Sequence, residues 1–133
     1  MVMQGNYSVR IEKYAERHFI SSFAKKYNQH WDVTLRAIVF SLEHIDSLLL
    51  TDKAETISDV DGVKIIKMKF TVAKSGESAK SSGNRCIVAW HKDKQFVSVL
   101  LVYGKTDLSG HNETAEWKML IRENYPEYKE HCK

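Results

Sequence analysis

The chain has 133 residues, of which 43% are apolar and 28% charged, and a net charge of +3 at neutral pH. This length and balance are those of a globular domain over residues 1–133 with its own core. The strongest apolar run, Phe96 to Tyr103, is far shorter than the roughly 20 residues of a membrane-spanning helix. The N-terminus lacks the layout of a signal peptide, so we expect a cytoplasmic protein. The two cysteines have no ligand-like spacing, which argues against a disulfide, a zinc site or another cofactor.

The first half of the sequence predicts one strand and two helices. Residues 7–12 have the composition of a strand, and apolar side chains recur at helical spacing over residues 14–28. A second helix is expected over residues 30–50. Its apolar stripe consists of Trp31, Leu35, Ile38, Val39, Leu42, Ile45 and Leu49. Residues 51–62 are interpreted as a polar connection that ends in a turn at Asp61-Gly62.

The second half predicts three strands and one helix. In residues 63–72, apolar side chains alternate with Lys67, Lys69 and Thr71, as in a strand with one buried face. A loop over residues 73–84 leads to strands over 85–91 and 95–103, which are joined by a tight turn. Asn112 is placed to cap a helix over residues 113–124, and Pro126 ends it.

The predicted order of elements is therefore strand, two helices, three strands and a last helix. We expect an α+β fold: a small antiparallel sheet with two N-terminal helices and one C-terminal helix packed on it.

Basic side chains are concentrated in the middle of the chain. Between Lys64 and Lys105 there are nine lysines and arginines and two acids, a charge of +7 that leaves −4 for the rest. Such a segment indicates a surface for phosphate and hence nucleic acid. A solvated, lysine-rich sheet explains the same charges, and charge alone leaves both interpretations open.

The sequence resembles RelE/HigB-type toxins of the RelE/ParE toxin–antitoxin superfamily. The similarity lies in the succession "IIKMKF", "SSGNRCIVAW", "FVSVLLVYGK" and "ETAEWKMLI", over roughly residues 63–123. The resemblance implies an endoribonuclease that cuts messenger RNA on the ribosome, inhibits translation, and is silenced by a cognate antitoxin protein. It also implies attack by a ribose 2′-OH on the adjacent phosphate, which leaves a 2′,3′-cyclic phosphate.

The resemblance assigns catalytic roles to three residues around the second predicted strand. Lys67 and Lys69 match strand lysines that hold phosphate or act as the base. Arg85 matches an arginine on the scissile phosphate, where a guanidinium fork binds two oxygens. Two exposed lysines and an arginine in an ordinary salt bridge are the alternative interpretation.

Three further candidate site residues lie in the predicted loops. The resemblance places Lys105 on phosphate or the ribosome, Lys80 is counted as a second phosphate contact, and His111 is a candidate acid for the leaving oxygen. Each is also consistent with a solvated loop residue. The loop over residues 73–84 is longer than the usual hairpin of the family and is expected to be a flexible insertion.

The sequence also departs from the family pattern. Some members carry a catalytic arginine after the lysine at the position of Lys105, where this chain has Thr106. Two other functions therefore stay open: a ParE-like toxin that binds DNA gyrase without cutting RNA, and a non-catalytic RNA-binding module. Trp90 and Tyr103, which have the chemistry to stack on bases, are expected in the core because their strand neighbours are apolar.

Overall fold

The computed structural model describes residues 6–104, 107–108 and 112–133. Within them the strands are β1 (Ser8–Ile11), β2 (Ala54–Val60), β3 (Val63–Lys69), β4 (Arg85–His91) and β5 (Phe96–Tyr103). The helices are α1 (Lys13–Ala15), η1 (Glu16–Ile20), α2 (Ser21–Tyr27), α3 (Gln29–Glu43), α4 (Ile45–Leu48), α5 (Ala79–Ser82), α6 (Glu113–Asn124) and η2 (Pro126–Cys132). The α+β class is confirmed, and the bounds of β4 and α6 are those predicted.

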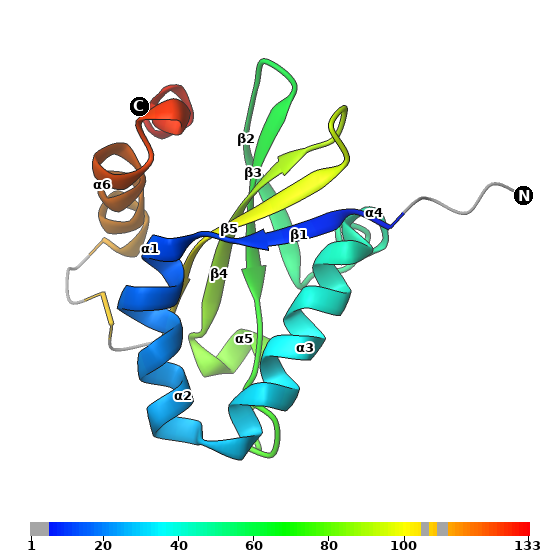
Figure 1. The fold of residues 1–133 in the computed structure, drawn as a ribbon, viewed down its shortest axis with the longest axis vertical. Coiled ribbons are helices and arrows are strands. Elements are labelled where there is room, and N and C mark those ends of the chain that lie inside the picture. Colours follow the sequence, from blue (N-terminus) through cyan, green and yellow to red (C-terminus); the bar gives the residue numbers. More distant parts are fainter. Residues whose placement is uncertain (1–5, 105–106, 109–111) are drawn as a thin grey trace, which may run out of the picture.

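The strands form one five-stranded mixed sheet in the order β1-β5-β4-β3-β2. The prediction of a fully antiparallel sheet is wrong, because β1 pairs with β5 in parallel while the other pairs are antiparallel. A parallel pair needs a long crossover rather than a hairpin. Here the intervening chain contains the N-terminal helices and the other three strands, and β1 then lies on the outer side of β5 (Figure 1).

The sequence did not predict strand β2, because its residues have the polar composition of a connecting loop. It is an edge strand with a register shift between Thr56 and Ser58, and Glu55 and Asp59 are exposed on it. Polar and charged residues are tolerated at a sheet edge, where they discourage pairing with another chain. The predicted turn is confirmed: Asp61 and Gly62 both have positive φ, at 52° and 80°, as a tight β-hairpin requires.

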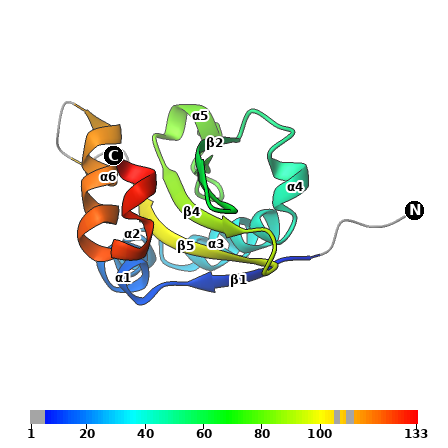
Figure 2. The same ribbon diagram turned by 90° about the horizontal axis from the view of Figure 1, so that it is seen from above.

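Helices cover both faces of the sheet (Figures 1 and 2). On one face the N-terminal helices bury a cluster that includes Trp31, Ile38, Leu42, Val88 and Trp90. On the other face α6 and η2 bury a second cluster. Its large members are Ile65, Ile87, Leu100, Leu101, Tyr103, Trp117, Ile121, Tyr125 and Tyr128. The predicted core positions of Trp90 and Tyr103 are confirmed, with exposures of 3% and 1%.

The segment expected to be a flexible insertion contains the short helix α5. Ser78 and Ser81 form a reciprocal capping box at its start, and Gly83, with φ of 75°, ends it in the left-handed region. The buried Ser82 hydroxyl donates to the carbonyl of Phe70 at 2.6 Å. This segment is therefore tied to the end of β3.

Candidate functional site

The register of the central strands brings the predicted catalytic residues to one end of the sheet. Lys69 lies opposite Arg85, and Arg85 lies opposite Tyr103. Side chains of directly opposed residues share a sheet face, and Lys67 shares it because it lies two residues from Lys69. This is the face that α6 covers, because Tyr103 belongs to the cluster beneath that helix. We call Lys67, Lys69, Arg85 and Tyr103 the sheet-end cluster.

Arg85 is half-buried and holds the segment that precedes it. Its guanidinium donates to the carbonyls of Asn84 at 2.9 Å and of Ala79 and Lys80 at 3.3 Å. These contacts use three of the five N–H donors of a guanidinium. Arg85 thus fixes α5, and the remaining N–H donors of its guanidinium are left for a ligand at the end of the sheet.

Lys67 lies between two carboxylates instead of on an open cationic surface. Its Nζ is 3.9 Å from Oε1 of Glu55 and 3.7 Å from Oε2 of Glu113, and its side chain is only 17% exposed. Glu55 is its cross-strand neighbour on β2, whereas Glu113 is the first residue of α6. A lysine acts as a base where like charges surround it, and the neighbours of Lys67 are of opposite charge.

Lys69 is placed differently from Lys67. Its Nζ donates to the carbonyl of Asp52 at 3.4 Å, and its cross-strand neighbour is Arg85. Lys69 and Arg85 are therefore basic residues in opposed positions at the end of β3 and β4. Two cations side by side suit an anion with several oxygens, such as a phosphodiester.

The Lys80 side chain is exposed on α5, and the backbone carbonyl of Lys80 accepts one of the hydrogen bonds from Arg85. The remaining two predicted residues, Lys105 and His111, lie outside the described residues, as does Thr106. The structure therefore brings Lys67, Lys69 and Arg85 together and leaves the other assignments as predictions.

Glu113 is a site residue that sequence reasoning missed. Its carboxylate accepts a hydrogen bond from the Tyr103 hydroxyl at 2.7 Å and pairs with Lys67. Burial, together with this hydrogen bond, raises the pKa of Tyr103, so the phenol stays a donor. A glutamate at the start of a capped helix is common for reasons of helix stability alone, and no further feature of the sequence indicates that Glu113 faces the sheet.

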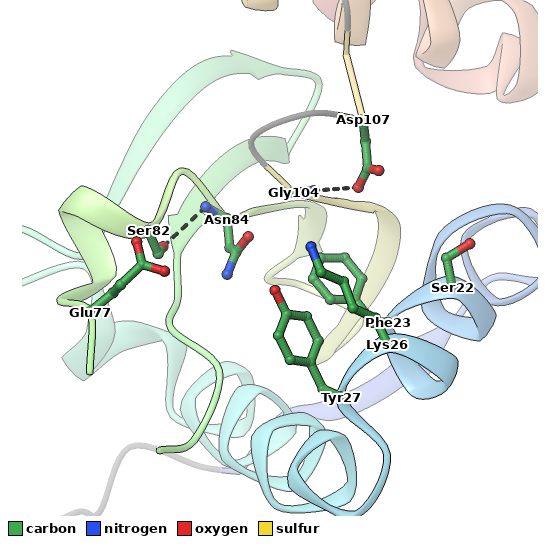
Figure 3. A pocket seen from close by; sticks show the side chains of 9 residues that line it. All are labelled: Ser22, Phe23, Lys26, Tyr27, Glu77, Ser82, Asn84, Gly104 and Asp107. Carbon is green, nitrogen blue, oxygen red and sulfur yellow. Dashed lines mark hydrogen bonds between the residues drawn. The ribbon is translucent and has the colours of Figure 1, made fainter. Parts of the chain in front are cut away.

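A pocket of about 340 Å³ lies at the same end of the sheet, between α2 and the segment that leads into β4 (Figure 3). Its walls carry Ser22, Phe23, Lys26, Tyr27, Glu77, Ser82, Asn84, Gly104 and Asp107. Asn84 immediately precedes Arg85 but belongs to this pocket, because successive strand residues point to opposite faces. The sequence contained no motif for the pocket, since its walls come from three separate segments.

Cys86 follows Arg85 on β4 and is buried in the core cluster beneath the N-terminal helices. Burial raises the pKa of the Cys86 thiol to about 12, which makes this cysteine an inert core residue. Among the described residues, no group of three or more His, Cys, Asp or Glu side chains is placed to hold a metal ion. No helix in the described part of the chain is long and apolar enough to cross a membrane.

Comparison with known proteins identifies a similar fold. No protein-family model and no curated protein sequence matches the chain. Among solved structures, the chain is similar to one in the crystal structure of the archaeal RelE–RelB complex from Pyrococcus horikoshii OT3. The TM-score is 0.51 at 13% sequence identity, over 77% of this chain and 99% of that chain. The fold is therefore RelE-like.

Proposed function

We propose that this protein is the toxin of a bacterial type II toxin–antitoxin pair and that it cleaves messenger RNA on the ribosome. The observation that carries the proposal is the sheet-end cluster, in which Lys69 and Arg85 occupy opposed strand positions and the Glu113 carboxylate contacts Lys67 and the Tyr103 phenol. The RelE-like fold supports it. Cleavage by a 2′-OH needs no metal, but it needs a base, cations for the phosphate and a proton for the leaving oxygen.

In this proposal Lys69 and Arg85 bind the scissile phosphate. The ribose 2′-oxygen attacks phosphorus and loses its proton to a base. The bond from phosphorus to the 5′-oxygen breaks, and that oxygen receives a proton. Negative charge on the phosphate oxygens is greatest during this exchange, and two cations fixed in advance stabilise it. The guanidinium is already oriented by its bonds to the α5 carbonyls.

Glu113 is the carboxylate best placed to accept the 2′-OH proton. It lies at the sheet-end cluster, where Lys67 and Tyr103 hold its carboxylate from two sides. Lys67 then serves as a cation that orients the base, which refines the role that the resemblance implied for it. The Tyr103 hydroxyl is fixed as a donor toward the same carboxylate. His111 stays the candidate acid that protonates the leaving oxygen.

We further propose that a cognate antitoxin protein silences the toxin by covering this end of the sheet. The similar archaeal protein was crystallised as a complex with RelB. A partner that presents carboxylates to Lys69 and Arg85 would exclude RNA by occupying the phosphate position. Because both ligands need the same cations, we expect RNA and the antitoxin to compete.

The test is controlled expression in bacteria of the wild type, Arg85→Ala and the matched control Arg36→Ala. Arg36 is exposed on α3, away from the sheet end. We expect growth arrest with new RNA 5′ ends inside translated frames for the wild type and for Arg36→Ala, and neither effect for Arg85→Ala. Urea unfolding of the purified variants separates loss of activity from loss of fold.

The other results of this test have distinct meanings. Growth arrest without new RNA ends contradicts the nuclease and favours the gyrase-binding function, which a supercoiling assay then checks. Absence of arrest, together with salt-sensitive RNA binding, favours the non-catalytic RNA-binding module.

A further inference from the structure

The pocket between α2 and the 73–84 segment contains a buried polar side chain that faces the cavity. Asn84 is 7% exposed, and in Figure 3 its amide points into the space bounded by Tyr27 and Lys26. Within the described part of the chain this amide has no hydrogen-bond partner. In the described part of the chain, the fully buried side-chain polar atoms without a partner are the Nε1 atoms of Trp31, Trp90 and Trp117, so the Asn84 amide is open to the pocket. The pocket therefore presents a donor and an acceptor that a ligand can satisfy.

The amide is held in a fixed position by the main chain around it. The backbone N–H of Asn84 donates to the Ser82 hydroxyl at 3.0 Å, and its carbonyl accepts from Phe70 N at 3.2 Å. Arg85 holds the same carbonyl from the other side of the sheet. A preorganised group loses little freedom on binding, which is how small pockets gain affinity.

The wall opposite Asn84 is aromatic. Tyr27 stacks on Phe23, with ring centroids 5.9 Å apart and an interplanar angle of 22°. Phe23 in turn stacks on Trp31 at 4.7 Å, so the wall is backed by the core. Flat heterocycles stack on such rings regardless of their exact substituents.

The charges of the lining disfavour an anion as the occupant. Lys26 is the basic side chain of the lining, against the acids Glu77 and Asp107. The Asp107 carboxylate already accepts from the backbone N–H of Gly104 at 2.6 Å. A neutral ring with hydrogen-bonding groups on its edge suits this lining better than a phosphate does.

From these observations we infer that the pocket binds one nucleobase of the RNA strand. The base would stack on the Phe23–Tyr27 wall and pair with the Asn84 amide, and its phosphate backbone would lie on Lys69 and Arg85. Because Asn84 and Arg85 are consecutive and face opposite sides of the sheet end, one strand passing that end reaches both. This inference rests on the proposed function for the identity of the strand.

The test is a titration of the full-length protein with each of the four free nucleosides, in which ¹H–¹⁵N NMR spectra are recorded at each nucleoside concentration. Nucleosides carry a base but no phosphate, so they probe the pocket without the sheet-end cations. We expect shifts of the Asn84 side-chain amide and the Gly104 backbone amide, with preference for some bases. Asn84→Ala should weaken the affinity by about tenfold, as loss of paired bonds to a base edge does.

A second variant fills the pocket instead of removing the amide. A Cβ added at Gly104 would lie 3.2 Å from Oδ1 of Asn84 and 3.4 Å from Cζ of Phe23. Gly104→Ala should therefore abolish nucleoside binding. A control should keep the affinity within about twofold of the wild type: Asn124→Ala, an exposed asparagine on α6.

The two proposals fail in different ways. Nucleosides that leave the Asn84 and Gly104 resonances unshifted, or that shift residues elsewhere, overturn the inference even if the toxin still cuts RNA. A pocket occupied by a side chain of the antitoxin, with no response to nucleosides, also overturns it. Nucleoside binding at Asn84 by a protein that makes no new RNA ends supports base recognition and contradicts the nuclease.

Discussion

The Nζ of Lys67 lies 3.7 Å from the Glu113 carboxylate, so the first residue of α6 is paired with a lysine of β3. This pair joins two segments that are far apart in the sequence. It ties α6 to the sheet and supplies the proposed active site with a carboxylate. The stability of α6 and the chemistry of the site therefore depend on the same contact.

Replacement of Glu113 by glutamine should lower the stability of the protein and impair RNA cleavage. The variant keeps the shape but loses the charge that Lys67 and Tyr103 contact, and hydrogen bonds to charged groups contribute about 1.5–3 kcal/mol. We expect the free energy of unfolding to fall by about 1–2 kcal/mol, a lower range because Glu113 is partly exposed, and RNA cleavage to be lost. Urea unfolding and RNA end mapping measure the two effects.

Glu116→Gln is the matched control, because Glu116 lies in the same first turn of α6. It should change stability by no more than a few tenths of a kcal/mol and leave cleavage intact. If Glu113→Gln and Glu116→Gln lost equal amounts of stability and of cleavage activity, Glu113 would act only through the helix dipole.

The stability of the protein should decrease as the pH falls below about 6.5. Burial lowers the pKa of His91, helped by Lys94 and Arg10, and burial also lowers the pKa of His131. Both histidines lie where η2 packs on the sheet: His91 shares a hydrogen bond with Tyr128, and His131 with Ser58. Because the folded protein binds these protons less readily than the unfolded chain, acid favours unfolding.

The check is urea unfolding at several pH values from neutral to about 5, the range in which histidine titrates. The stability should be fully present above the ordinary histidine pKa of 6.5 and should be lost below it. His131→Gln should flatten this dependence. A profile of the wild type that is flat down to pH 5 would contradict the prediction.

Ser82→Ala should loosen the segment that positions Asn84 and Arg85. The hydroxyl donates to Phe70 O and accepts from Asn84 N, and both contacts are buried. We expect a loss of about 1–3 kcal/mol, because two buried backbone groups lose their partner. Ser47→Ala, on an exposed helical surface, should be nearly neutral. Equal stability of the two variants would mean that α5 is held by other contacts.

The turn between β2 and β3 should require its glycine. Gly62 has φ of 80°, which costs an L-residue other than asparagine or aspartate about 1 kcal/mol or more. Gly62→Ala should lower stability by about that amount, whereas Gly62→Asn should lower it less. Thermal unfolding of both variants is the measurement, and an alanine variant as stable as the wild type would contradict the prediction.

The sequence predicted well those elements whose pattern is local. Strand β4 and helix α6 were placed at their observed bounds because a continuous apolar run and an asparagine cap mark them clearly. Strand β2 was missed because its edge position permits a polar sequence. The parallel pairing of β1 with β5 was missed because side-chain periodicity within a strand does not identify its neighbour.

The arrangement of the candidate site was also only partly predictable, because local sequence patterns do not show how distant elements pack. The alternation in β3 placed Lys67 and Lys69 on one face, and their cross-strand neighbours follow once the hairpins are known. The contact of Lys67 with Glu113 depends on where α6 lies over the sheet, and the pocket at Asn84 depends on how α2 packs. Neither packing arrangement has a signature in the local sequence.

Cleavage at the sheet-end cluster is tested most directly by the chemistry of the RNA ends produced when the protein is expressed. We expect 2′,3′-cyclic phosphates on the upstream fragments and free 5′-hydroxyls on the downstream ones, in amounts that fall sharply in Arg85→Ala and Glu113→Gln. This result would establish attack by the ribose 2′-oxygen at the sheet-end cluster. Fragments that end in a 3′-hydroxyl, or cyclic phosphate ends that persist in both variants, would contradict it.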